Sequence, residues 1–259
     1  MTERPPIRRA PPDFEVVEVV AVTERSPRLR AITLAGPGLE GFRLDGPAAS
    51  LRLLLRRDGQ LELPRWTGNE FRFEDGTRPP IRTVTPLRPD PERGSVDVEV
   101  VLHPGAPGPL SDWGQHAAPG EQVAVSGPGR GYPVDATDRR YLIVGDESAL
   151  PAIGQLLETL PAAAELDVVV EVSHPDAVVE LPDHPGATID WRVLPAGARP
   201  GDAMVAAVEQ RSIDPSGRVW AAGEAAAVQR IRKHLEAAGV SRPRTTVRGY
   251  WKLGRAVGG

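Results

Sequence analysis

Cysteine is missing altogether from this chain of 259 residues. Its absence excludes disulfide bonds, thiolate metal sites, iron–sulfur clusters and cysteine nucleophiles. Lysine is scarce as well: it occurs at positions 233 and 252 alone, and arginine carries the remaining side-chain positive charge. With a formal net charge of −4, the chain lacks the basic excess that a general nucleic-acid binder needs to displace counterions.

Long apolar segments are also missing. Residues 1–13 contain arginine and proline but no apolar core of the kind found in a signal peptide. The longest apolar runs elsewhere in the chain are too short to span a bilayer. We therefore expect a soluble protein of the cytoplasm.

The first half of the chain has the pattern of antiparallel β structure. Segments rich in Val, Ile and Leu, which we expect to be strands, cover residues 14–22, 28–34, 50–56 and 95–102. Apolar and acidic residues alternate strictly within 96–100, as in a strand with one buried face. Clusters of Gly and Pro separate the segments, and a short helix is expected over 109–118. Short strands between turn signals predict a small barrel.

The second half of the chain has a different pattern of secondary structure. Predicted strands cover residues 140–144, 166–172, 188–194, 218–221 and 245–250, with helices expected over 148–160, 202–210 and 224–238. Strands that alternate with helices predict a parallel sheet covered by helices on both faces. The fold class is thus a β-barrel plus an α/β domain. The Gly-rich stretch 127–133 marks the boundary, so we predict domains at 1–133 and 134–259.

Two clusters in the first domain have the chemistry of an anion site. The first, after a Pro-Pro break, consists of Arg82, Thr83, Val84, Thr85 and Arg88. A guanidinium binds phosphate oxygens bidentately, and hydroxyls suit the ring nitrogens of a flavin. Taken alone, this segment also fits an ordinary polar strand.

The second cluster lies where the strand 95–102 leads into the predicted helix. It consists of His103, Gly108, Pro109, Leu110, Ser111 and Trp113. Free backbone amides at a helix start attract anions. The alternatives are a structural histidine and a tryptophan that belongs to the core.

The candidate residues of the second domain lie at strand ends. Asp146 and Ser148 occupy the strand-to-helix turn where a dinucleotide binds in folds of this class, and Gly223 and Glu224 end a later strand. The turn has no Gly-x-Gly-x-x-Gly pattern, and acids repel a pyrophosphate. The residues alone therefore favour helix caps at these positions.

Two adjacent aromatic residues, Tyr250 and Trp251, stand near the C-terminus and are followed by Lys252 and Arg255. The rings either bury the edge of the sheet or cover a bound cofactor. The basic helix around Arg230 to His234 fits a solvated face better than a substrate site.

Together these segments resemble the siderophore-interacting proteins, a family of flavin-dependent ferric reductases with a ferredoxin-reductase-like fold. The resemblance lies in Arg82-Thr83-Val84-Thr85, residues 103–113, the turn 145–151 and Gly249-Tyr250-Trp251 with Gly254. It implies FAD between the two domains and a terminal aromatic residue beside the flavin ring. The chain departs from the family pattern at Val84, where the family has Tyr, and Arg88 comes one residue later than expected.

The resemblance further implies an FAD-dependent reductase of ferric siderophores that uses NADPH, NADH or a reduced ferredoxin as donor. It assigns cofactor binding to both first-domain clusters and to Asp146, Ser148, Gly223, Glu224, Tyr250 and Trp251. Candidate contacts to an anionic chelate are Lys252, Arg255, Arg65 and Arg130. No protein ligand to the metal is expected. The alternatives are an FAD oxidoreductase with a non-iron acceptor and a redox-inactive siderophore-binding protein.

Overall fold

The structure is a computed structural model that describes residues 11–103 and 108–254. Its first domain is a sheet of seven strands in the order β6-β3-β9-β1-β2-β8-β7, with antiparallel pairing throughout. The strands are β1 (Glu15–Ser26), β2 (Leu29–Ala35), β3 (Leu51–Leu54), β6 (Ile81–Val84), β7 (Pro86–Asp90), β8 (Ser95–Val101) and β9 (Gln122–Ser126).

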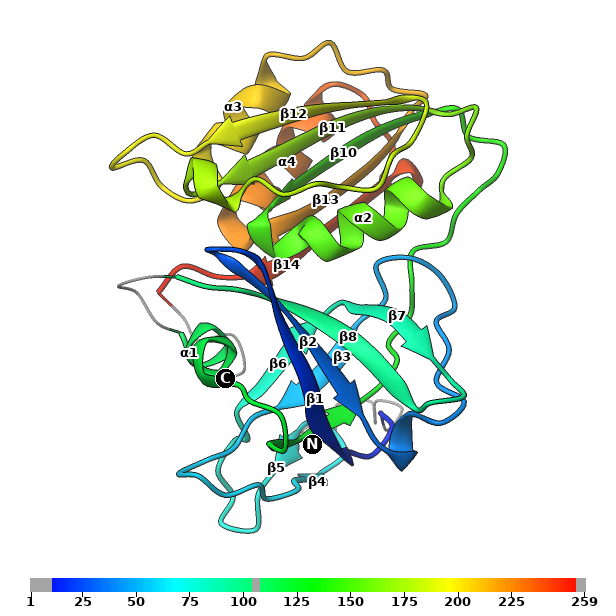
Figure 1. Cartoon of the computed structure of the whole chain (residues 1–259). Helices are drawn as coiled ribbons and strands as arrows, with labels where there is room; N and C mark the ends of the chain where they lie inside the picture. Colours follow the sequence, from blue (N-terminus) through cyan, green and yellow to red (C-terminus); the bar gives the residue numbers. More distant parts are fainter. Residues whose placement is uncertain (1–10, 104–107, 255–259) are drawn as a thin grey trace, which may run out of the picture.

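The two edge strands of this sheet, β6 and β7, follow each other in the chain with Thr85 alone between them. A single residue spans only a few ångströms. The sheet must therefore curl until its edges meet at Thr85, which is buried. Figure 1 shows the resulting curled sheet in the lower half of the molecule, and the predicted barrel is confirmed.

Apolar residues that alternate along the strands fill the inside of this barrel. The helix α1 (Pro109–His116) packs against β8 and contributes Trp113 to the barrel core. Two short strands, β4 (Arg65–Trp66) and β5 (Phe71–Arg72), form a ribbon at the end remote from the second domain (Figure 1). A 3-10 turn, η1 (Pro37–Leu39), completes this half of the chain.

The second domain is a parallel sheet in the order β12-β11-β10-β13-β14. Its elements are β10 (Arg140–Asp146), η2 (Glu147–Ala149), α2 (Leu150–Thr159), β11 (Glu165–Val172), η3 (Pro175–Ala177), β12 (Ala187–Val193), α3 (Asp202–Glu209), β13 (Arg218–Glu224), α4 (Ala225–Ala237), η4 (Arg242–Arg244) and β14 (Thr245–Trp251). α2 packs on one face, and α3 and α4 pack on the other. The α/β expectation is therefore confirmed.

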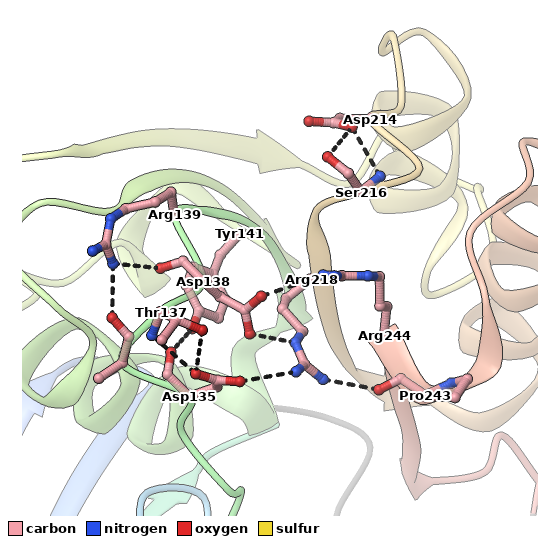
Figure 2. A network of polar contacts seen from close by, with 11 residues as sticks. Asp135, Thr137, Asp138, Arg139, Tyr141, Asp214, Ser216, Arg218, Pro243 and Arg244 are labelled. Atoms are coloured by element: carbon pink, nitrogen blue, oxygen red, sulfur yellow. Dashed lines mark hydrogen bonds and ion pairs between the residues drawn. The ribbon is translucent and has the colours of Figure 1, made fainter.

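A polar network holds the amino-terminal ends of β13 and β14 beside the domain linker (Figure 2). Arg218, at the start of β13, donates to Asp138 at 2.5 Å and to the Pro243 carbonyl at 2.9 Å. Arg244 also reaches Asp138, at 3.2 Å. This network ties the linker before β10 to the starts of β13 and β14, at the sheet edge opposite the candidate site.

The domains meet along α2 and β14 (Figure 1). The Gln155 side chain on α2 accepts from the Ala48 amide at 2.9 Å and donates to the Pro86 carbonyl at 2.8 Å. Leu29 and Ala48 of the barrel also join the apolar core around α2. The predicted boundary at 133/134 falls between β9 and β10 and stays a prediction. None of the helices within 11–103 and 108–254 is long and apolar enough to cross a membrane.

Candidate functional site

Asp146, the last residue of β10, is the centre of the candidate site in the second domain. Its buried carboxylate accepts from the Ser148 amide at 3.0 Å and the Ser148 hydroxyl at 2.5 Å. The Glu224 amide and the Trp251 indole Nε1 donate to its other oxygen, both at 2.8 Å. Burial raises the pKa of Asp146, and these hydrogen bonds oppose the rise. One carboxylate thus joins β10, β13 and β14.

Gly223 makes room for that carboxylate. It has a φ of +149°, and a Cβ added there would lie 2.5 Å from Asp146 Oδ2. The pairing of β13 with β14 shifts register between Gly223 and Glu224. A side chain at position 223 is therefore incompatible with the observed place of Asp146.

Glu224 holds both the start of α4 and the end of β14. Its Oε2 accepts from the amides of Ala226 at 2.6 Å and Ala227 at 2.9 Å, which caps the helix. Its Oε1 accepts from the Leu253 amide at 3.2 Å. The structure thus brings Asp146, Ser148, Gly223 and Glu224 together with Trp251, as a clamp on the C-terminal strand.

Tyr250 connects this clamp to the barrel. Its ring stands edge-on to Trp220, with centroids 6.3 Å apart and planes at 85°. Its phenol lies beside the side chain of Thr85, the residue that links the barrel edges. Burial raises the pKa of the Tyr250 phenol to about 12, and the neighbouring Thr85 side chain acts to lower this pKa. The aromatic pair is therefore divided: Tyr250 faces the barrel and Trp251 is tied to Asp146.

Arg82 on β6 is a half-buried cation. Its guanidinium donates to the Ile81 carbonyl at 2.7 Å, and no carboxylate pairs with it among the residues that the structure describes. Burial lowers its pKa. A desolvated guanidinium without a counter-ion fits a phosphate. Thr83 is exposed, and Val84 packs into the barrel core.

The second barrel cluster is organised by Ser111, which is buried at the start of α1. Its hydroxyl accepts from the His103 amide at 2.8 Å and fixes the chain on both sides of residues 104–107, which lie outside the described part. Gly108 precedes the helix without a side-chain cap, Pro109 follows, and Leu110 packs against the barrel core. His103 is exposed.

The structure places Trp113 of the same cluster in the barrel core, which is the alternative that the sequence left open. Its indole donates to Glu121 at 3.2 Å. The Trp113 ring is therefore engaged within the first domain.

Several other predicted residues lie apart from this site. Arg88 on β7 pairs with Asp97 at 2.8 Å and lines a cavity of about 360 Å³ between the barrel and α2. Arg65 pairs with Glu74 at 2.8 Å in the remote ribbon. Arg130 is exposed in the linker.

The last two predicted chelate contacts are at the C-terminal end. Lys252 is exposed directly after Trp251. Arg255 lies outside the described residues. The roles proposed for both side chains stay predictions.

Three buried or interface residues were missed by sequence reasoning. Glu171 accepts from the amides of Gly201 at 2.6 Å and Met204 at 2.9 Å, and Glu147 accepts from the Ser173 amide and hydroxyl at 2.5 and 2.7 Å. The third is Gln155 at the domain interface. Glu171 and Glu147 could have been found from the sequence, because each is an acid at or directly after the end of an apolar strand. Nothing in the sequence marks Gln155.

Comparison with known proteins agrees with this arrangement. Residues 138–254 match the family model of the siderophore-interacting protein, and residues 18–132 match that of the siderophore-interacting FAD-binding domain. The NADPH-dependent ferric-chelate reductase of Escherichia coli is 30% identical over 243 residues, covering 92% of each chain. The ferric vibriobactin reductase ViuB of Vibrio cholerae is 29% identical, covering 89% of this chain and 86% of ViuB.

A solved structure shows the same fold over nearly the whole chain. The siderophore utilization protein from T. fusca superimposes with a TM-score of 0.83 at 31% identity, covering 96% of both chains. Both halves of the sequence thus match models of one family, in the order and with the fold that the structure shows. The chain belongs to the siderophore-interacting protein family.

Proposed function

We propose that this protein is an FAD-dependent reductase of ferric siderophores that takes its electrons from NAD(P)H. The observation that carries the proposal is the half-buried Arg82, a cation without a carboxylate partner in the described part of the chain. It lies in the matched FAD-binding region, on the strand that leads to the contact between Thr85 and Tyr250. The reductase names of the E. coli and V. cholerae relatives support the same activity.

The described residues fit FAD. Arg82 would bind the pyrophosphate bidentately, together with backbone amides near Gly108 and the turn that Ser111 fixes. Thr85 and Tyr250 would lie at the flavin ring, in the interface between the two domains. A bound flavin accepts two electrons as a hydride and passes them on one at a time, which ferric iron requires.

The protein's task toward the iron is positioning. The siderophore itself holds the metal, and its oxygen donors bind ferrous iron less well than ferric iron, so reduction releases it. Exposed cations would attract an anionic chelate: Lys252 directly follows the C-terminal strand, and Arg130 lies on the linker. Arg255, outside the described residues, stays a candidate from the sequence. Since NAD(P)H is a cytoplasmic donor, the cytoplasm is the proposed location. A reduced ferredoxin is the alternative donor.

The test begins with the visible absorption spectrum of the purified chain before and after addition of FAD. An anaerobic mixture with NADPH or NADH, a ferric siderophore and a ferrous trap follows. Flavin bands that bleach with the donor and recover as ferrous iron is trapped are expected. A chain that takes up no FAD would contradict the proposal and favour a siderophore-binding role.

A pair of variants connects the result to the site. Arg82→Gln removes the proposed phosphate contact and is expected to weaken FAD binding by roughly one to two orders of magnitude, as loss of a charge-assisted hydrogen bond does. The control is Arg65→Gln, whose side chain is exposed in the remote ribbon. Equal FAD affinity in the two variants would remove Arg82 from the site.

A further inference from the structure

The carboxyl edge of a parallel sheet is where folds of this class bind a dinucleotide. The pyrophosphate usually lies against free backbone amides at a helix start, where the helix dipole favours negative charge. In this chain that edge is formed by the ends of β10, β11 and β13. Each of the three strands has a buried acid at its carboxyl end. These acids are Asp146 and Glu147 at β10, Glu171 at β11 and Glu224 at β13.

The turn after β10 is occupied by the chain itself. Asp146 accepts from the Ser148 amide at 3.0 Å and from the Glu224 amide at 2.8 Å. These are donors that a phosphate in this turn would need. The Asp146 carboxylate is fixed in that place, because the missing Cβ of Gly223 leaves space for it and Trp251 donates to it.

The starts of α3 and α4 are occupied in the same way. Glu171 accepts from the amides of Gly201 and Met204 at the start of α3. Glu224 accepts from those of Ala226 and Ala227 at the start of α4. An incoming phosphate would have to displace a buried carboxylate at either helix.

The end of β11 is the position where such folds read the adenosine ribose and its 2′-phosphate. Here the Ser173 amide and hydroxyl both donate to Glu147, and His174 faces Asp176 at 3.2 Å. The donors suited to a 2′-phosphate are therefore already engaged with carboxylates. The neighbouring charge is negative.

Besides engaging the amide donors, the buried acids would repel a pyrophosphate electrostatically. Asp146, Glu147, Glu171 and Glu224 are only 3–7% exposed, and no ion pair to Arg or Lys balances them in the described part of the chain. Their neutralising partners are amide, hydroxyl and indole donors. A pyrophosphate would bring further negative charge to an edge that has little water to screen it.

We propose that this edge excludes the pyrophosphate of the donor, so that the protein recognises NAD(P)H through its dihydronicotinamide ring alone. This inference rests on the proposed function. In the reaction, the dihydronicotinamide gives up a hydride and becomes the nicotinamide cation. The two electrons reduce two ferric ions to ferrous ions, and the remaining proton goes to solvent. The adenosine diphosphate part stays in solvent and adds no binding.

The first experiment compares three donors on the FAD-loaded full chain: NADPH, NADH and 1-methyl-1,4-dihydronicotinamide, which has no pyrophosphate. The bleaching rate of the flavin is measured against donor concentration and divided by the donor's rate with free FAD. We expect the bleaching rate to rise linearly with the concentration of each donor, without saturation. The normalised slopes of the three donors should agree within roughly threefold, because the pyrophosphate adds no binding energy. Saturation by NADPH at micromolar concentration, or no reaction with any dihydronicotinamide, would overturn the proposal.

The second experiment needs no turnover. ADP-ribose carries the pyrophosphate without the nicotinamide, and we expect calorimetry to show no saturable binding to the FAD-loaded protein up to millimolar concentration. Micromolar binding of ADP-ribose would contradict the exclusion.

Glu147→Gln tests the charge directly. Both Ser173 donors lie on one oxygen, Oε1, so a glutamine keeps these hydrogen bonds and removes one charge. We expect the normalised bleaching slope with NADPH to rise about threefold to tenfold with the repulsion relieved, and the slope with 1-methyl-1,4-dihydronicotinamide to stay the same. The matched control is Glu165→Gln, an exposed acid at the opposite end of β11. An unchanged NADPH slope in Glu147→Gln would count against the proposal.

A separate arm keeps the two proposals distinguishable. The FAD-loaded protein is reduced with dithionite, freed of excess reductant and mixed with a ferric siderophore and a ferrous trap. Trapped ferrous iron in this arm supports the reductase whatever the donor experiments give. No trapped iron here would remove the function on which the inference rests.

Discussion

Single carboxylates do much of the positioning at this site, and within residues 11–103 and 108–254 they do so without cationic partners. Asp146 is surrounded by an amide pair, a hydroxyl and an indole, all of which donate. A buried charge that is fully hydrogen-bonded avoids the large cost of an unpaired one. The arrangement fixes the strand that carries Tyr250 and Trp251 more specifically than apolar packing alone.

Gly223→Ala is expected to destabilise the protein strongly. The new Cβ would lie 2.5 Å from Asp146 Oδ2, and the φ of +149° is unfavourable for a side chain. We expect a loss of about 2–4 kcal/mol in the free energy of unfolding, from backbone strain and the broken hydrogen bonds of Asp146. Denaturant-induced unfolding followed by far-ultraviolet circular dichroism measures it.

Gly154→Ala is the matched control for this substitution. Gly154 lies inside α2, and its added Cβ would come no closer than 3.5 Å to Pro182. Alanine in a helix interior is favoured over glycine by roughly 0.5–1 kcal/mol, so this variant should be slightly more stable. Similar losses in both variants would show that the Asp146 contact is not the cause.

At the residue scale, the sequence predicted what is local. Capping by Asp146 follows from an acid before a helix start. The structure shows Asp146 capping the 3-10 turn η2 that leads into α2, whereas α2 itself has no side-chain cap at its N-cap residue, Ala149. The hydrogen bond from Trp251 to Asp146 spans 105 residues, so no local pattern contains it. The same holds for the contact between Tyr250 and Thr85, which depends on how two separate domains meet.

Among the elements, α4 depends on Glu224 for its start. Glu224→Ala removes the acceptor for the Ala226 and Ala227 amides and for the Leu253 amide. We expect a loss of about 1–2 kcal/mol, as for other helix caps, and greater mobility of the C-terminal strand. Thermal unfolding gives the first quantity, and amide exchange near Leu253 gives the second.

Glu224→Gln separates these two roles. A glutamine oxygen can still accept from Ala226 and Ala227, so most of the stability should remain. The amide nitrogen would then face Leu253, so exchange there should still be faster than in the original protein. A glutamine variant as unstable as the alanine variant would contradict the capping account.

Elements with a strong periodic pattern were predicted well, and one central strand was not. β9 has four consecutive buried residues, Val123 to Ser126, and so shows no alternation of apolar and polar residues. It lies between β3 and β1 in the middle of the sheet, although it comes last in the barrel sequence. Burial on both faces removes the alternation from which a strand is recognised.

Across the whole molecule, all three tyrosines of the chain resist ionisation. Burial raises the pKa of Tyr132, and raises that of Tyr141 and of Tyr250 to about 12 each. An unfolded tyrosine ionises near pH 10. Between about pH 10 and 12 the folded chain therefore keeps protons that the unfolded chain has lost.

The sign of the stability change follows from this difference. When the unfolded state binds fewer protons, stability falls as pH rises. The contribution is complete below about pH 10 and is lost as pH rises toward 12. A near-ultraviolet titration should show tyrosinate appearing late and together with unfolding. Gradual ionisation of the tyrosines well before unfolding would contradict their burial. The Tyr250→Phe variant identifies the part of the tyrosinate signal that comes from Tyr250.

The relative placement of the two domains depends on Gln155. Its side chain joins α2 to the Ala48 amide and to the Pro86 carbonyl, next to the Thr85 that meets Tyr250. Gln155→Ala leaves a buried donor and acceptor unpaired at the interface, which costs roughly 1–3 kcal/mol of the coupling between the domains. Each domain keeps its own core, so each should stay folded.

The expected result is a looser interface rather than an unfolded protein. Calorimetric unfolding should broaden or split into two transitions, and FAD should bind several-fold more weakly if it lies between the domains. Glu158→Ala, one helical turn further along α2, lines the cavity without joining the domains by a hydrogen bond and serves as the control. If FAD affinity is unchanged in Gln155→Ala while the transitions separate, the flavin is held by the barrel alone, and Tyr250 is not part of its site.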